Sequence, residues 1–135
     1  SLMKKTILFS LCLFVFTSIA VAQNQERLSV HYFDVPDQLV EEFLAFNKTR
    51  NQMLEDAGFG KDFYKLYRVT DGDEAGQYRY FMISQYTSDK HYEMTHNVSE
   101  AYQKLNDSFW DSELGTIFTM DDKGHIYRKV YRIED

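Results

Sequence analysis

Cysteine and proline are almost absent from this chain of 135 residues. The one cysteine, Cys12, lies in an apolar stretch near the beginning, so the remainder has no disulfide, no thiolate nucleophile and no cysteine metal ligand. The one proline, Pro36, interrupts little of the chain, which otherwise has a regular periodicity and no low-complexity tract. We therefore expect packing of an aromatic core, rather than covalent links, to stabilise the fold.

Motifs of several well-known enzyme classes are also missing. The sequence contains no glycine-rich phosphate loop, no Gly-x-Ser-x-Gly nucleophile turn and no His-Glu-x-x-His zinc motif. The acidic clusters at 71–74 and 121–122 lack the spacing of a calcium-binding loop and indicate solvated turns. Glu93 and His96 have the Glu-x-x-His spacing of a metal-binding helix, but di-iron bundles use this motif twice with further glutamates. We expect no metal site and no cofactor.

The first 22 residues have the pattern of an export signal. Two lysines at 4–5 precede an apolar run at 7–19, and the sequence Ala-Val-Ala at 20–22 supplies a cleavage pattern. The run is about 13 residues long, whereas a membrane span needs roughly 20, so we expect cleavage and no stable membrane anchor. Residues 1–2 precede the start methionine and look like a cloning remnant. Export without disulfides favours a bacterial periplasmic or extracellular protein.

Removal of this signal makes the chain more acidic. The whole chain has 15 basic and 21 acidic residues and a net charge of −6; without two lysines, 13 basic residues remain and the charge becomes −8. Such a protein repels nucleic acid and anionic membrane surfaces, so we expect neither as a partner. Residues 23–135 are enough for one core and too few for two ordinary domains, which predicts a single domain.

Hydrophobic periodicity predicts the first four elements. Alternation predicts a strand over 27–34, and apolar residues at helical spacing predict a helix over 37–57 that ends at Gly58. Aromatic and β-branched residues predict strands over 63–70 and 78–87, which a turn at 71–76 joins into a hairpin.

The remaining segments predict a second helical region and a second hairpin. Ser88 is suited to cap a helical region over 89–110 that bends or breaks near Asn97. Strands are predicted over 116–120 and 125–133. The fold class is then α+β, a ferredoxin-like β-α-β-β-α-β order with an extra C-terminal strand, in which an antiparallel sheet has both helices on one face. The face of the sheet opposite the helices must then be buried by something else.

The stretch from Tyr78 to Leu105 contains an apolar strand that ends in Gln-Tyr-Thr-Ser-Asp at 85–89, then a helix with His96, Ser99 and Ala101-Tyr102. In these residues it resembles the dimeric α+β barrel superfamily, especially its antibiotic-biosynthesis-monooxygenase-like and NIPSNAP-like groups. The resemblance implies that two copies pair their sheets and enclose a barrel that holds a small ligand or an active site. Function does not follow from the fold alone.

If the resemblance holds, one set of alternating side chains lines the barrel. On the third strand Phe81 and Ile83 would face the helices, while Tyr78, Tyr80, Met82 and Ser84 would face the barrel. The same alternation places His31, Phe33, Tyr64, Leu66 and Arg68 in the barrel, with His96 near its mouth. The candidate ligand-binding residues are His31, Arg68, Tyr78, Tyr80 and Met82. An aromatic pocket with a few polar groups suits a small aromatic or hydrophobic ligand. The alternative is that these tyrosines fill a dimer interface.

Histidine is the usual acid or base near neutral pH. We expect His125 to be an exposed residue at the start of a strand and His91 to be a solvated or capping residue. His31 is either a pocket residue or a hydrogen-bonded core residue, and His96 carries the family resemblance. The candidate catalytic residues are His31, Tyr80 and His96.

Three functions remain open. The first is an exported, homodimeric small-molecule-binding protein of undefined ligand. The second is a cofactor-free monooxygenase-like enzyme that acts on a small aromatic or quinol-like substrate. The third is a structural or interaction dimer without a ligand site.

Haem is a remote possibility that the resemblance raises, because some relatives in the superfamily bind or degrade it. Those relatives use a helical tryptophan and histidine. An approximate alignment puts Thr95 and Leu105 at these two places. The match is therefore poor.

Overall fold

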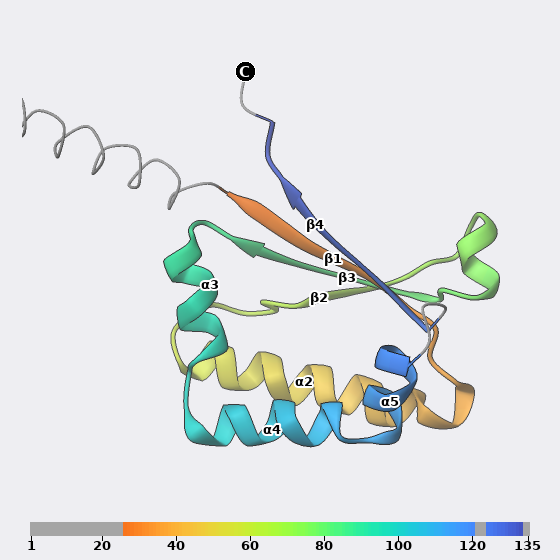
Figure 1. Ribbon diagram of the computed structural model, residues 1–135, viewed down its shortest axis with the longest axis horizontal. Helices are drawn as coiled ribbons and strands as arrows, with labels where there is room; N and C mark the ends of the chain where they lie inside the picture. The colour runs from red at the N-terminus through yellow and green to blue at the C-terminus, as the bar shows by residue number, and fades with distance from the viewer. Residues whose placement is uncertain (1–25, 121–123, 134–135) are drawn as a thin grey trace, which may run out of the picture.

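A four-stranded antiparallel sheet is the frame of the molecule (Figure 1). The computed structural model describes residues 26–120 and 124–133, so the predicted signal segment lies outside the described residues. The strands are β1 (Arg27–Phe33), β2 (Lys65–Arg68), β3 (Tyr80–Tyr86) and β4 (His125–Tyr131), in the order β2-β3-β1-β4. All neighbouring strands run antiparallel. The arrangement is α+β and compatible with the ferredoxin-like class.

Helices connect the strands, and the α-helices gather on one side of the sheet, where α2 and α4 run side by side, while η2 lies in the connection between β2 and β3 (Figure 1). They are η1 (Asp37–Leu39), α2 (Val40–Asp56), η2 (Asp73–Gly76), α3 (Asp89–His96), α4 (Glu100–Trp110) and α5 (Glu113–Met120). Within 26–120 and 124–133, no helix has the length and apolar character that crossing a membrane requires.

Two serine caps divide the region from Asp89 to Trp110 into α3 and α4. The hydroxyl of Ser88 accepts a hydrogen bond from the backbone N–H of His91 at 3.0 Å, and that of Ser99 accepts one from Tyr102 at 3.1 Å. Each bond satisfies a donor that the first helical turn leaves open. The predicted cap at Ser88 and the predicted break near Asn97 are both confirmed.

The predicted strand over 116–120 is wrong, because these residues belong to the helix α5. Its β-branched residues favour a strand locally. Burial decides otherwise, since Leu114 and Phe118 lie one helical turn apart and both pack into the core. The extra C-terminal strand is therefore missing, and β4 is the one strand that follows α4 in the described residues.

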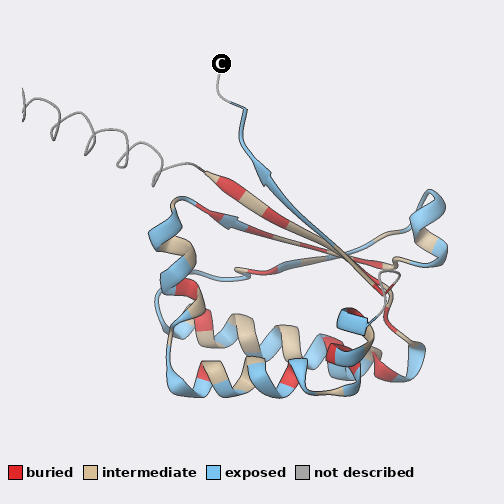
Figure 2. Cartoon of the chain, in the orientation of Figure 1, coloured by how far each residue is buried: buried red, intermediate tan, exposed pale blue. Residues whose placement is uncertain are grey.

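The hydrophobic core lies between the sheet and the helices, as the buried segments in Figure 2 show. Tyr80, Met82 and Ser84 are buried on the helix side of β3, whereas Phe81 and Ile83 lie on the opposite face. The prediction had these two faces exchanged. Both faces of β3 are rich in apolar side chains, so alternation identified the two sets without showing which one meets the helices.

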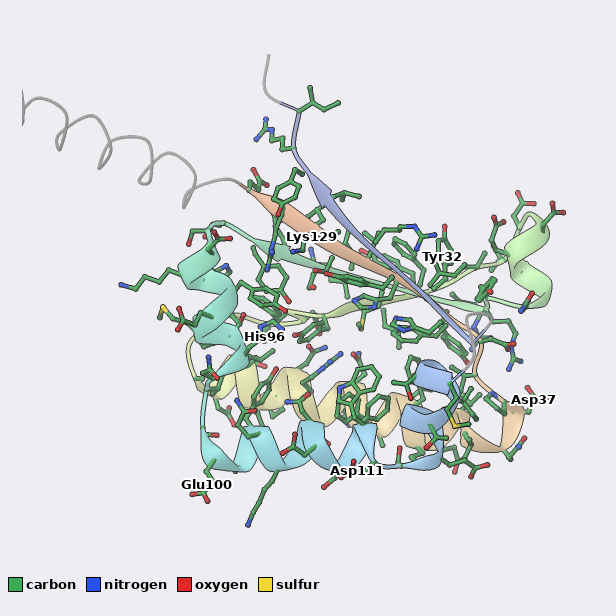
Figure 3. The ribbon with its side chains drawn as sticks, viewed as in Figure 1. Tyr32, Asp37, His96, Glu100, Asp111 and Lys129 are labelled. Carbon is green, nitrogen blue, oxygen red and sulfur yellow. The ribbon has the colours of Figure 1, made fainter. Side chains whose placement is uncertain are left out.

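The sheet face opposite the helices, here called the open face, carries a row of apolar side chains. The register aligns Tyr67, Phe81, Tyr32 and Ile126 across the four strands. The rings of Tyr32 and Phe81 lie 5.0 Å apart, and those of Tyr67 and Phe81 lie 6.2 Å apart. Tyr67 is 51% exposed. None of the described helices covers this row, and Tyr32 is labelled there in Figure 3.

Candidate functional site

A cavity of about 400 Å³ lies between the helix side of the sheet and the helices α2, α3 and α4. Protein interiors are close-packed, with few voids larger than a water molecule. A space of this size is instead typical of small-molecule sites, which span roughly 300–1,000 Å³. The largest share of its wall is aromatic: Phe33, Phe43, Phe46, Tyr64, Tyr86, Tyr92, Tyr102, Phe109, Trp110 and Tyr127.

Regular elements position the polar groups of the wall. Ser29 and His31 alternate along β1 and therefore point to the same side of the sheet. Phe46, Asn47 and Arg50 lie three and four residues apart on α2, so they share one helical face. These groups therefore stand on a strand and a helix, which hold side chains more firmly than loops do.

Arg50 is the charged group of the cavity. The centre of its guanidinium lies 3.5 Å from the centre of the Tyr64 ring and 4.8 Å from that of Phe46. Its Nη2 donates to the Sδ of Met82 at 3.2 Å, and a thioether sulfur is a weak acceptor. Its buried Nε has no acceptor, and the ion pairs found among residues 26–120 and 124–133 do not include Arg50.

His31 and His125 form a pair across β1 and β4. Their Nδ1 and Nε2 atoms are 2.7 Å apart, and their rings are stacked with centres 5.0 Å apart. One ring must accept this hydrogen bond, so at least one is neutral. Burial, together with the charges of His125 and Arg50, lowers the pKa of His31 from 6.5 to about 3. The prediction that His125 is an exposed residue is wrong, because it is half-buried and stacks on Phe33.

His96 lies near the end of α3, where the helix approaches the sheet and α2 (Figure 3). Its Nδ1 donates to the backbone carbonyl of Tyr92 at 2.7 Å, which leaves Nε2 as an acceptor in the neutral ring. The ring stacks on Tyr92 with centres 3.9 Å apart. Burial chiefly lowers the pKa of His96, and the charges of Arg50 and Arg27 lower it further. His96 is therefore a neutral, hydrogen-bond-accepting ring at neutral pH.

Tyrosine hydroxyls provide donors in the same space. The hydroxyls of Tyr64 and Tyr86 lie 3.5 Å apart, and Ser84 donates to the hydroxyl of Tyr86 at 3.2 Å. Burial raises the pKa of Tyr86 and also that of Tyr102. Both phenols stay protonated at neutral pH and can donate hydrogen bonds to a ligand.

The cavity brings together three of the residues that the sequence predicted for a site, namely His31, Met82 and His96. Tyr80 is buried in the core, where its ring lies 5.5 Å from that of Phe43, and it borders a separate depression with the exposed Arg68. The ring of Tyr78 packs 6.2 Å from that of Tyr32. A ligand role for any of these residues stays a prediction.

The most informative residue that the sequence reasoning missed is Arg50. A signal was present, because Arg50 interrupts the apolar stripe of its helix between Phe46 and Met53. Tyr92 and Tyr102 were also missed, since their positions depend on how α3 and α4 pack against the sheet.

The described residues contain no group of three or more His, Cys, Asp or Glu side chains that could hold a metal ion. Thr95 and Leu105, the residues at the two haem-related positions, do not line the cavity. The Thr95 hydroxyl instead donates to the backbone carbonyls of His91 and Tyr92 at 3.0 and 2.9 Å.

No protein-family model matches the chain, and no curated protein matches it at the level of a reliable relative. The resemblance to the dimeric α+β barrels therefore stays a prediction, and the site must be argued from its geometry.

Proposed function

We propose that this protein binds a small, largely aromatic molecule in the cavity between its sheet and its helices. The cavity itself is the observation that carries the proposal. At about 400 Å³ it can hold one or two fused or linked rings with their substituents. Its aromatic wall would bury the rings of such a ligand, and the hydroxyls and imidazoles would fix its orientation.

A matched pair of substitutions on α4 tests this proposal. Asn106 lines the cavity, whereas its neighbour Asp107 is exposed on another side of the helix. We expect calorimetry to show that the uncharged probe naphthamide binds the wild type and Asp107→Phe, but binds Asn106→Phe at least about tenfold more weakly because the added ring fills the space. Equal binding by the two variants, or failure of the wild type to bind either naphthamide or the corresponding carboxylate, would refute the proposal.

We further propose a ferredoxin-like homodimer in which a second copy covers the open face. A sheet that is apolar on both faces must bury both. The row from Tyr67 to Ile126 is self-complementary, since a twofold axis through it would set the same aromatic and aliphatic groups against each other. The third interpretation, a dimer without a ligand site, is disfavoured. Such a dimer would form through the open face and would not account for the cavity on the helix side of the sheet.

A second candidate function is a cofactor-free monooxygenase-like enzyme that acts on an aromatic or quinol-like substrate. The neutral Nε2 of His96 favours it, because this atom can accept a proton from a bound phenol. If this holds, oxidation of naphthohydroquinone by dissolved dioxygen, which takes up the two electrons and two protons as hydrogen peroxide, will run faster with the wild type than in buffer, and His96→Ala will lose the difference. An unchanged rate in His96→Ala would remove His96 from the chemistry.

Export of the protein is proposed on the sequence of its first 22 residues alone. The mass of the protein recovered from the periplasm of a bacterial host tests it. A mass that still includes these residues would contradict cleavage.

A further inference from the structure

Within the described part of the chain, the wall of the cavity has basic groups and no acidic ones. Its described lining residues include Arg50, His31 and His96, and none of them is an aspartate or a glutamate. The chain as a whole has a net charge of −6. The positive character of the cavity is therefore a local property and not a reflection of the overall composition.

The guanidinium of Arg50 is only partly compensated within the protein. Its Nη2 reaches the Oδ1 of Asn47 at 3.5 Å and the sulfur of Met82 at 3.2 Å, which are long or weak interactions. Its Nε is buried without an acceptor among the residues that the structure describes. The stacked ring of Tyr64 stabilises the cation but accepts no hydrogen bond in the guanidinium plane. Arg50 is half-buried, and charges that are withdrawn from water are usually paired, so its guanidinium leaves a free position for an anion.

A second arginine adds positive potential at the α3 end of the same space. Arg27 is 6% exposed, and the centre of its guanidinium lies 4.0 Å from the centre of the Tyr92 ring, which lines the cavity. Across 26–120 and 124–133, Arg27 also lacks an ion-pair partner. Its charge and that of Arg50 both reach His96, because both lower the pKa of that ring. The field in this part of the cavity therefore favours a negative group.

We infer that the ligand is an aromatic carboxylate whose anionic group pairs with the guanidinium of Arg50. This inference rests on the proposed function, since it requires a ligand in the cavity. A carboxylate matches the planar donors of arginine better than a single hydroxyl does. With the carboxylate at Arg50, the rings would pack against Phe46, Tyr102 and Phe109, whose side chains surround the rest of the space.

Matched pairs of probes separate charge from shape. Benzoate, naphthoate and biphenylcarboxylate are each compared with the corresponding primary amide, which has nearly the same size and no charge. Calorimetry with the full chain is done on the wild type and on Arg50→Gln, Arg50→Lys and Lys48→Gln. The last variant is the control, because Lys48 is an exposed cation on the same helix that does not line the cavity.

We expect the wild type to bind at least one carboxylate about tenfold or more tightly than its amide, as hydrogen bonds between charged groups require. Arg50→Gln should lose this preference while its affinity for the amide changes little. Arg50→Lys should keep part of it, and Lys48→Gln should keep all of it. The Arg50→Lys variant and the wild-type comparison remain informative if Arg50→Gln folds poorly.

Two outcomes would overturn the inference. The first contradicts only the role of Arg50, and the second also contradicts the proposed function. Equal binding of carboxylates and amides by the wild type, or a preference that persists in Arg50→Gln, would show that Arg50 serves the aromatic packing of Tyr64 alone; the ligand cavity would survive. If no probe of either kind binds the wild type, the proposed function fails as well.

Discussion

The side chains around the cavity bring a histidine pair close to a guanidinium group. His31 is buried beside a second imidazole and under the influence of Arg50, and these surroundings oppose its protonation. Arg50 itself stays charged, because guanidinium groups do not lose their proton in proteins. The result is a neutral histidine pair next to a fixed cation, and none of the described residues that line the cavity is a carboxylate. This combination would favour the bound anion that we propose.

The lowered pKa of His31 predicts a pH dependence of stability. Its pKa is about 3 in the folded protein and 6.5 in the unfolded chain, so between these values the unfolded chain binds the extra proton. The free energy of unfolding should therefore fall as the pH drops below 6.5, with His31 contributing at most about 1.4 kcal/mol per pH unit. Urea unfolding between pH 7 and about 4.5 measures this. His31→Gln should show a shallower fall, and parallel curves would contradict the assignment to His31.

Residues of the candidate site were predictable where a local sequence pattern indicated them. His31 and Met82 were correctly grouped by alternation, which is a property of every strand. Arg50 was not identified, because a basic residue in a helix is usually solvated and its neighbours in space come from α2, from the segment just before β2 and from β3. The pairing of His31 with His125 depends on the register of β1 with β4, which joins residues 94 positions apart.

At the scale of elements, α5 depends on a close approach to the end of α4. A Cβ atom on Gly115 would lie 2.3 Å from the backbone oxygen of Trp110, a separation that atoms do not tolerate. Glycine is therefore required there so that Leu114 and Phe118 can reach the core.

We predict that Gly115→Ala lowers the free energy of unfolding by about 1–3 kcal/mol, the range for overpacked interiors. Gly76→Ala is the matched control, since a Cβ there has no atom within 4 Å, and it should change stability by less than about 0.5 kcal/mol. Urea denaturation compares the two. Equal effects would mean that the contact with Trp110 is relieved at little cost.

Caps and amphipathic stripes made most elements predictable. The exception is the segment 116–120, where local strand preference competes with burial in the core. Ser88 and the stripe of α2 act within a few residues, so their effect is visible in the sequence. Residues 116–120 contain β-branched and aromatic side chains that favour a strand. They are helical because the burial of Phe118 against Phe33 and Phe43 outweighs that preference.

At the scale of the whole molecule, the two faces of the sheet differ in their surroundings. The helix side forms the core and the cavity, while the open face carries the apolar row that we propose a second copy covers. Alternation predicted the membership of each face but exchanged their roles, because the positions of the helices depend on packing of the entire chain.

The proposed dimer leads to a prediction for Phe81, the centre of the apolar row. Light scattering after size exclusion should show a dimer for the wild type at micromolar concentration and a monomer for Phe81→Glu, since a carboxylate there would be buried without a partner. Leu44→Glu is the control, because Leu44 is exposed on α2 and should tolerate the charge. A wild-type monomer would contradict the dimeric barrel.

The central claim is that the space between the sheet and the helices, and not the open face, binds an aromatic ligand. Amide chemical shifts of the full chain during titration with naphthoate test it most directly. We predict that the largest changes occur at His31, Arg50, His96 and Tyr102, on β1, α2, α3 and α4. Changes centred on Tyr32, Tyr67 and Phe81, or no saturable change at all, would contradict it.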